Sequence, residues 1–126
     1  MAHRIGIAGI TGRMGRLLAE EVPAADATLI GGIGRPGSAR PGPDGVALLP
    51  DIASLAEACD VVIDFTHAAA AGPNATALAK AGKPWVLGTS GLSAGDEAAV
   101  ERAAGSIPVV YASNFSAGVN LVLKRT

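Results

Sequence analysis

Three glycines at intervals of three residues stand near the start of the chain, in the segment Gly9-Ile10-Thr11-Gly12-Arg13-Met14-Gly15. The segment follows an apolar run over residues 5–8 and precedes a stretch with helical character. Where a buried strand turns tightly into a helix, backbone N–H groups and the helix dipole attract an anion, and missing Cβ atoms let a phosphate come close. The segment therefore predicts a nucleotide cofactor at this end of the molecule, with a plain tight turn as the alternative.

The spacing of these glycines indicates which kind of nucleotide is expected. Gly-x-x-Gly-x-x-Gly has one residue more between its first two glycines than the commonest dinucleotide fingerprint. Gly12-Arg13-Met14 lacks the Gly-Lys-Ser/Thr sequence with which a P-loop holds phosphate and Mg²⁺. Placed after the first strand of an α/β pattern, the glycines favour a dinucleotide cofactor.

The end of the second predicted strand bears on the choice between NADH and NADPH. Sites that prefer NAD carry an Asp or Glu about 20 residues after the glycines, which accepts hydrogen bonds from the ribose 2′-OH. This chain has Ile33-Gly34-Arg35 at that point and no acid within reach. The planar guanidinium of Arg35 could pair with a 2′-phosphate, and Arg13 is a second candidate cation. NADPH is the favoured cofactor, with NADH also possible, and solvated loop arginines are the alternative.

Polar turns follow three further predicted strands, at Asp64-Phe65-Thr66-His67, Gly88-Thr89-Ser90-Gly91 and Ala112-Ser113-Asn114-Phe115-Ser116. In doubly wound folds ligands bind at the carboxyl ends of parallel strands, where all three turns are expected. Phe65 could press on a nicotinamide face, and Thr66 could hydrogen-bond to its edge or cap the next helix. The other two turns could contact a carboxamide or a substrate, or be ordinary connections.

Apolar runs alternate with alanine-rich stretches along the chain, which predicts a single α/β domain with a doubly wound parallel sheet. Gly82 and Gly105 stand where helix C-caps are expected, and Ser93 with Asp96 forms a capping-box pattern. The predicted strands are Arg4–Ala8, Thr28–Ile33, Val61–Asp64, Trp85–Leu87 and Val109–Tyr111, and the predicted helices are Gly12–Val22, Ile52–Ala58, Ala68–Ala81 and Ala94–Ala104.

Two stretches fall outside this alternation. Arg35–Pro50 holds four prolines and three glycines, too many for a regular element, and is expected to form an excursion close to the cofactor. Ala117–Thr126 is expected to open a helix, which would start the connection to a further domain.

The composition disfavours several functional classes. The 126 residues carry a net charge of -1 and no block of Lys or Arg, so neither a nucleic acid nor a membrane is an expected partner. Cys59 is the single cysteine, which excludes an intrachain disulfide and a cysteine metal cluster. It precedes a predicted strand and is a poor candidate nucleophile. With no signal-peptide segment and no apolar run of membrane-spanning length, a cytoplasmic protein is expected.

Four segments together resemble 4-hydroxy-tetrahydrodipicolinate reductase, also called dihydrodipicolinate reductase, of bacterial lysine and diaminopimelate synthesis. They are the glycine segment 9–15, Asp64-Phe65-Thr66, Gly88-Thr89-Ser90-Gly91 and Asn114-Phe115-Ser116-Ala117-Gly118-Val119-Asn120. They occur in the family's order and span almost the whole chain. The resemblance implies an NAD(P)H-dependent oxidoreductase of Rossmann-like fold, of which residues 1–126 are the cofactor-binding domain.

The resemblance also implies roles for individual residues. Gly9–Met14 would hold the pyrophosphate, and Arg35 would hold the adenosine ribose or its 2′-phosphate. Gly88–Ser90 and Ala112–Phe115 would contact the nicotinamide side. Gly34 stands where the family often has an acidic residue, which weakens the case for tight NADH binding.

Members of this family continue into a second, mostly β domain with a His-His pair, a catalytic lysine and a Ser-Gly-Thr turn. By the resemblance, that domain binds a small cyclic dicarboxylate substrate and forms the homotetramer. These motifs are not among the 126 residues, so no catalytic residue and no metal ligand is assigned, and the chain alone is expected to bind cofactor with little or no turnover. A non-catalytic NADPH-binding module and the cofactor domain of another reductase, such as an aspartate or semialdehyde dehydrogenase, are the alternatives.

Overall fold

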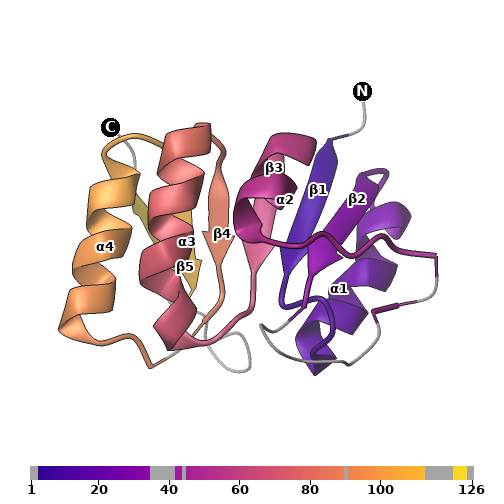
Figure 1. Cartoon of the computed structure of the whole chain (residues 1–126), viewed down its shortest axis with the longest axis horizontal. Helices are drawn as coiled ribbons and strands as arrows, with labels where there is room; N and C mark the ends of the chain where they lie inside the picture. Colours follow the sequence, from indigo (N-terminus) through magenta and orange to yellow (C-terminus); the bar gives the residue numbers. More distant parts are fainter. Residues whose placement is uncertain (1–2, 35–41, 44, 90, 113–120, 125–126) are drawn as a thin grey trace.

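The computed structural model describes residues 3–34, 42–43, 45–89, 91–112 and 121–124, with the backbone alone at 112 and 121–124. Strands and helices alternate along most of this length (Figure 1). The elements are β1 (Arg4–Ala8), α1 (Arg13–Ala24), β2 (Thr28–Ile33), α2 (Ile52–Ala58), β3 (Val61–Asp64), α3 (Ala68–Ala81), β4 (Trp85–Leu87), α4 (Ala94–Ala104), β5 (Val109–Ala112) and β6 (Leu121–Lys124).

Within the described residues the strands form one sheet in the order β2-β1-β3-β4-β5-β6. β1 pairs in parallel with both β2 and β3, and the parallel pairing continues from β3 to β4 and from β4 to β5. The carboxyl ends of these five strands therefore share one edge of the sheet. The prediction of an α/β domain with a parallel sheet is confirmed.

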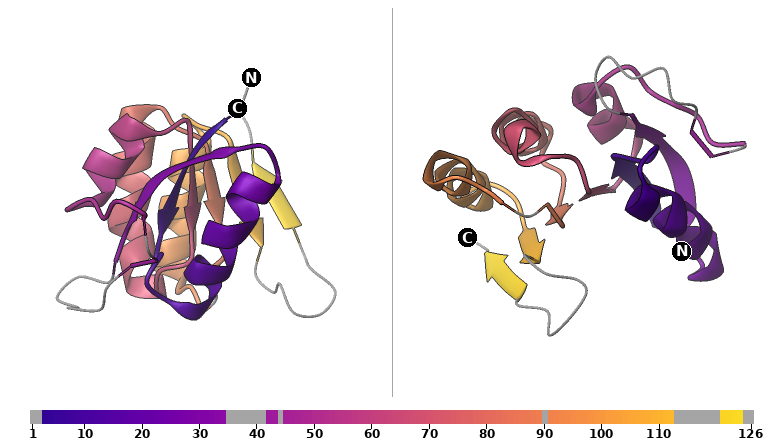
Figure 2. Two further views of the ribbon diagram at one scale, coloured as in Figure 1. Left: turned by 90° about the vertical axis from the view of Figure 1, so that its right-hand side faces the viewer. Right: turned by 90° about the horizontal axis from the view of Figure 1, so that it is seen from below.

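The helices cover the two faces of the sheet unequally. α1 lies on one face, and α2, α3 and α4 lie on the other (Figure 2). The buried side of α1 is made of Gly15, Ala19 and Val22, at helical spacing, and packs with Ile7 and neighbouring side chains in a small core. On the opposite face the larger core gathers buried side chains from β3, β4, β5 and the three helices, including Leu55, Val62, Leu78, Trp85, Leu87, Val100 and Val109.

Local capping signals explain where the helices begin and end. Ser93 and Asp96 form the predicted capping box, with Ser93 Oγ accepting from the Asp96 N–H at 3.1 Å and Asp96 Oδ2 accepting from the Ser93 N–H at 3.0 Å. Gly82 ends α3 with φ 71°, in the left-handed region that glycine adopts readily. Asp51 caps α2 by accepting from the Ser54 N–H at 2.8 Å, and this hydrogen bond holds the pKa of Asp51 below its usual value.

Part of the proline-rich segment is attached to the sheet. Leu49 N–H donates to the carbonyl oxygen of Gly32 at 2.8 Å, and Gly32 N–H donates to that of Ala47 at 3.0 Å. Leu48 forms an isolated parallel bridge with Gly32. The end of this segment thus lies along the outer edge of β2 instead of looping freely, while residues 35–41 and 44 are outside the described part of the chain.

The prediction that Ala117–Thr126 opens a helix is wrong where the chain is described. Residues 121–124 form β6, which pairs antiparallel with β5 so that Tyr111 faces Val122. The Leu-Val-Leu run satisfies its backbone hydrogen bonds on the second side of β5. The assignment of residues 117–126 to an interdomain connection stays a prediction.

Candidate functional site

The predicted glycine loop joins the carboxyl end of β1 to the first turn of α1. Gly9 has a φ of 84°, in the left-handed region. The N–H groups of Gly9 and Ile10 both donate to the carbonyl oxygen of Ile33, at 2.9 and 3.1 Å. Gly12 N–H donates back to the carbonyl oxygen of Gly9 at 3.1 Å, and the Thr11 side chain is buried. The loop is therefore closed on itself and tied to the end of β2.

The three glycines of the loop have different neighbours. A Cβ on Gly15 would lie 2.2 Å from the carbonyl oxygen of Gly9, and a Cβ on Gly9 would lie 2.8 Å from that of Phe65. A Cβ on Gly12 would meet the Gly9 oxygen at an ordinary 3.4 Å. Packing within the protein explains Gly9 and Gly15. It does not explain Gly12, whose missing side chain leaves space beside the helix N-terminus.

Among the described residues, no acidic side chain caps the N-terminus of α1. Gly12 is the N-cap and supplies no side-chain hydrogen bond, and the first turn contains no acidic residue. By contrast, α4 begins with a capping box and carries Asp96 and Glu97 in its first turn. The backbone N–H groups and the positive dipole end of α1 are therefore available to an external anion. The residues present fit the pyrophosphate of a dinucleotide.

The candidate cations are only partly described. Arg13 and Met14 lie exposed on the first turn of α1. One turn later, Arg16 Nε donates to the carbonyl oxygen of Thr11 at 3.3 Å, which steadies the loop from the helix side. Arg35, the predicted reader of a 2′-phosphate, lies outside the described residues. The preference for NADPH stays a prediction.

A buried carboxylate ends β3, next to the predicted nicotinamide turn. Asp64 is completely buried. Its Oδ1 accepts from the N–H and the hydroxyl of Thr66, at 2.9 and 2.6 Å. Its Oδ2 accepts from Asn74 Nδ2 at 2.9 Å and from Trp85 Nε1 at 3.0 Å. Four neutral donors thus satisfy both oxygens, which is what keeps a buried carboxylate tolerable.

These hydrogen bonds change the interpretation of Thr66. The N-cap of α3 is His67, whose side chain makes no cap hydrogen bond, so the alternative that Thr66 caps this helix is wrong. The helix begins one residue later than a Thr66 cap would require. The Thr66 hydroxyl donates to Asp64 Oδ1 at 2.6 Å and accepts from Asn74 Nδ2 at 3.4 Å.

Backbone and hydroxyl hydrogen bonds join the turns after β1, β3 and β4. Phe65 N–H donates to the carbonyl oxygen of Ala8 at 2.9 Å, and Gly88 N–H donates to that of Asp64 at 2.8 Å. The Thr89 hydroxyl, in a side chain only 5% exposed, donates to the carbonyl oxygen of Thr66 at 2.7 Å. The three turns therefore form one connected edge.

The structure thus brings together most of the predicted site at the carboxyl edge of the sheet, the lower side of Figure 1. The glycine loop, Phe65, Thr66, Gly88 and Thr89 lie on connected turns, and the backbone of Ala112 ends β5 at the same edge. Four further predicted residues, Ser90, Ser113, Asn114 and Phe115, lie outside the described part of the chain.

Sequence reasoning missed two residues of this region, Asn74 and Trp85. Asn74 is buried within the alanine-rich α3, and Trp85 is almost fully buried at the start of β4. Asn74 is a single amide among the alanines of α3. Because a buried polar side chain needs a hydrogen-bond partner, this pattern could have indicated that Asn74 binds a polar group in the core. For Trp85, nothing in its apolar strand indicated that Nε1 reaches a carboxylate.

Cys59 lies away from this edge, at the amino end of β3. It is buried, and burial raises the pKa of its thiol although the positive charge of Lys83 acts in the opposite direction. A buried thiol of raised pKa holds little thiolate, so these properties agree with the expectation of a poor nucleophile.

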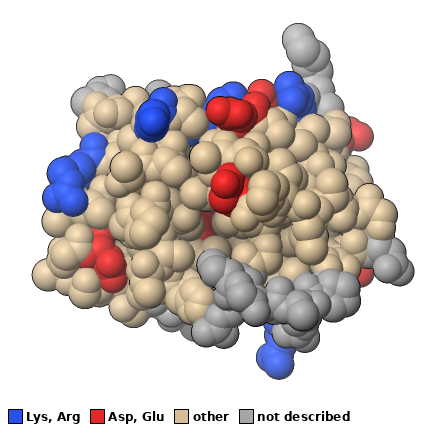
Figure 3. All heavy atoms as spheres, in the orientation of Figure 1, with Lys and Arg blue, Asp and Glu red and all other residues tan. Residues whose placement is uncertain are grey.

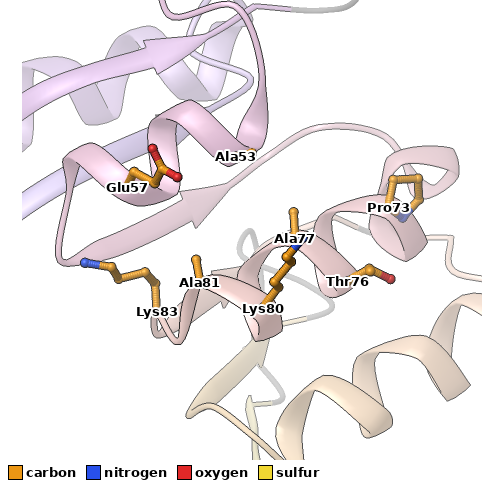
Figure 4. Close-up of a pocket in the computed structure, with 8 residues that line it drawn as sticks. All are labelled: Ala53, Glu57, Pro73, Thr76, Ala77, Lys80, Ala81 and Lys83. Atoms are coloured by element: carbon orange, nitrogen blue, oxygen red, sulfur yellow. The ribbon is translucent and has the colours of Figure 1, made fainter.

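A groove between α2 and α3 is separate from the candidate site. Figure 4 shows its lining, which combines alanines and a proline with one acidic and two basic side chains. The lining residues are Ala53, Glu57, Pro73, Thr76, Ala77, Lys80, Ala81 and Lys83. None of them is a predicted site residue.

Charge distribution and the placement of possible metal ligands bear on whether the described residues hold another kind of site. On the face seen in Figure 3, Lys and Arg are scattered among uncharged residues and are not gathered into one basic surface. Among the described residues, no three His, Cys, Asp or Glu side chains are placed to hold a metal ion. The helices of the described part are too short or too polar to cross a membrane.

Comparison with known families decides the family of this chain. The family described as dihydrodipicolinate reductase, N-terminus, matches residues 3–115. The chain belongs to this family. Curated proteins similar to this chain include 4-hydroxy-tetrahydrodipicolinate reductase from Granulibacter bethesdensis, 60% identical over 120 residues, and that from Acidiphilium cryptum, 57% identical over 120 residues. Each match covers 95% of this chain but 46% and 43% of the relative, so the chain spans less than half the length of these reductases.

Two solved structures of reductases have a fold similar to that of this chain. A dipicolinate-bound dihydrodipicolinate reductase from Paenisporosarcina sp. TG-14 superposes with a TM-score of 0.76 at 19% identity, covering 92% of this chain and 49% of that one. A Plasmodium falciparum pyrroline carboxylate reductase with NADP bound gives a TM-score of 0.64 at 20% identity, covering 87% and 41%. At these low sequence identities, the superpositions show that the folds are alike and nothing more.

Proposed function

We propose that this chain binds NAD(P)H as the cofactor half of a 4-hydroxy-tetrahydrodipicolinate reductase, with NADPH preferred over NADH. The observation that carries the proposal is the space at the start of α1 (the cradle), where Gly12 lies beside N–H groups that no acidic side chain of the described residues caps. Membership of the reductase family supports the same reading. The fold shared with a reductase that has NADP bound supports a dinucleotide.

The proposed roles follow the order of the turns along the sheet edge. Gly9–Met14 hold the pyrophosphate, and Arg35 holds the 2′-phosphate. Phe65 and Thr66 contact the nicotinamide end, together with Gly88–Ser90 and Ala112–Phe115. The cofactor supplies the hydride when it is bound, and the residues of this chain bind and orient it.

The substrate and the assembly belong to the whole protein. We propose a small cyclic dicarboxylate as substrate, a cytoplasmic location, and a homotetramer that forms through the part of the reductase outside this chain. For the 126-residue chain this predicts cofactor binding with little or no turnover. No residue of the chain is proposed as catalytic.

Gly12→Ala tests the cradle. The added methyl is expected to weaken NADPH binding by about tenfold or more, because it occupies the space proposed for the pyrophosphate. It meets no protein atom closer than 3.4 Å, and the poorer N-cap costs at most about 1 kcal/mol of stability. Isothermal calorimetry with NADPH and NADH measures the affinities, and thermal unfolding shows that the fold is kept.

Gly72→Ala is the matched control, since it adds the same methyl to a helical position of α3 where no heavy atom beyond its chain neighbours and the helix's own backbone lies within 4 Å. It should leave NADPH affinity unchanged. Equal affinities of the Gly12→Ala variant and the original chain would contradict the cradle. A titration repeated with pyridine-2,6-dicarboxylate should show no tightening of NADPH, and tightening or robust turnover would mean that the chain itself holds a substrate site.

Arg35→Ala tests the preference between the two cofactors. If the guanidinium pairs with the 2′-phosphate, its removal should weaken NADPH by about tenfold while NADH changes little, because a charge-assisted bidentate contact is lost with one ligand only. Parallel titrations with both nucleotides measure this. Equal losses of affinity for NADPH and NADH would show that Arg35 does not bind the 2′-phosphate.

A further inference from the structure

We propose that Asp64 is a positioning residue for the nicotinamide end of the cofactor, because its buried carboxylate fixes the backbone of the Phe65–Thr66 turn and, through Thr66, the side chain of Thr89. The inference rests on the proposed cofactor site. It assigns to Asp64 no contact with the cofactor itself.

The carboxylate acts as a link between the core and the turn. On the core side, Oδ2 is held by Asn74 from α3 and by Trp85 from β4, at 2.9 and 3.0 Å. On the turn side, Oδ1 accepts both the N–H and the hydroxyl of Thr66. Two donors from one residue on one oxygen restrict the direction in which that residue can face, and hydrogen bonds to a charged acceptor are stronger than neutral ones.

The restraint continues from Thr66 to the neighbouring turns. The carbonyl oxygen of Thr66 accepts from the Thr89 hydroxyl at 2.7 Å. On the other side, the Phe65 carbonyl lies so close to Gly9 that a Cβ there would come within 2.8 Å of it. A shift of the Phe65–Thr66 turn would therefore disturb both its neighbours. Precise placement of such turns is what a site needs in order to hold a cofactor ring in one orientation.

The nature of the link explains why a carboxylate is used. Burying it removes a charged group from water, which costs free energy unless hydrogen bonds replace the lost hydration. An apolar side chain at this position would avoid that cost but would leave Thr66, Asn74 and Trp85 without their acceptor. The carboxylate thus accepts hydrogen bonds from four donors, which come from the turn, a helix and a strand.

Asp64→Asn tests the inference with little change in shape. An amide offers one oxygen and one NH₂ group, so either the Thr66 pair or the Asn74–Trp85 pair must face a donor. We expect NADPH affinity to fall by about tenfold, whereas 2′-phospho-ADP-ribose, which lacks the nicotinamide, should bind within about twofold of its original affinity. Calorimetric titration with both ligands separates a loss at the nicotinamide end from a general loss of structure.

The control is Asp26→Asn, which removes the same charge from an exposed position with φ 61°, a conformation that asparagine tolerates. It should change neither affinity. Asn74→Ala is a second variant, used also if Asp64→Asn does not fold. It removes one donor from Asp64 Oδ2 without changing any proposed cofactor contact, and it should weaken NADPH by about threefold and 2′-phospho-ADP-ribose not at all.

Equal losses of both ligands, or no loss of NADPH affinity, in the variant that folds would overturn the inference. It would also fail if the original chain bound NADPH no more tightly than 2′-phospho-ADP-ribose, although the pyrophosphate cradle would then stand. If the original chain bound neither ligand, the proposed function itself would be wrong.

Discussion

Replacing Gly15 with alanine is expected to lower the free energy of unfolding by about 3 kcal/mol and to abolish nucleotide binding. The new Cβ would lie 2.2 Å from the carbonyl oxygen of Gly9 and 2.6 Å from the Cα of Ile10. Both are backbone atoms, so the clash is relieved only if α1 or the glycine loop moves. Either movement separates the N–H groups of α1 from the proposed pyrophosphate position. Urea unfolding followed by circular dichroism, with NADPH calorimetry, measures the two effects.

Gly95→Ala provides the comparison for stability. Gly95 lies in the first turn of α4, where a Cβ would meet Ser93 Oγ at an ordinary 3.7 Å. Alanine is the better helix former by up to about 1 kcal/mol, so this variant should be as stable as the original chain or more so. If the two glycine variants unfolded at similar urea concentrations, α1 would not pack on the glycine loop as described.

The second large effect is expected at Trp85. Its side chain is 1% exposed in the larger core, and Trp85→Ala should cost about 3–5 kcal/mol through lost burial and the cavity left behind. Trp85→Phe retains most of the apolar contact but removes the Nε1 donor from Asp64. That variant should cost about 1–3 kcal/mol. Urea unfolding of both variants, with its midpoint and slope, gives the free energies of unfolding to be compared.

Val86→Ala is the control on the same strand. Side chains alternate between the faces of a sheet, so Val86 points away from the larger core, and it is only half-buried. Its truncation should cost clearly less than that of Trp85. If Trp85→Phe proved as stable as the original chain, the hydrogen bond to Asp64 would carry no net stabilisation.

Elements with local signals were predicted closely. β1 to β4 and α2 to α4 have the predicted bounds, because apolar runs, capping residues and glycines mark both ends of each. α1 spans Arg13–Ala24 instead of the predicted Gly12–Val22: Gly12 is its N-cap, and the helix continues through Pro23 to Ala24. The glycine loop and the Phe65–Thr66 and Gly88–Thr89 turns were predicted to share an edge, and parallel pairing places them there.

Features that depend on distant residues were not predicted. β6 forms because β5 offers a second side for pairing, which its own sequence does not reveal. Two of the three residues that donate to Asp64 stand 10 and 21 residues away in the chain, at Asn74 and Trp85. Their meeting depends on how α3 and β4 pack, and no spacing rule along the sequence describes that geometry.

The order of the strands has a consequence for local opening of the fold. β1, β3 and β4 are each paired on both sides, so none of them is a sheet edge among the described strands. Interior strands separate only at free energies close to that of global unfolding, whereas edges fray at much lower cost. Each of these interior strands is followed by one turn of the proposed site: the glycine loop, the Phe65–Thr66 turn and the Gly88–Thr89 turn. Of the two outer strands, β6 can therefore open and close while these three turns keep their shape, whereas opening of β2 would remove the Ile33 carbonyl oxygen that holds the glycine loop.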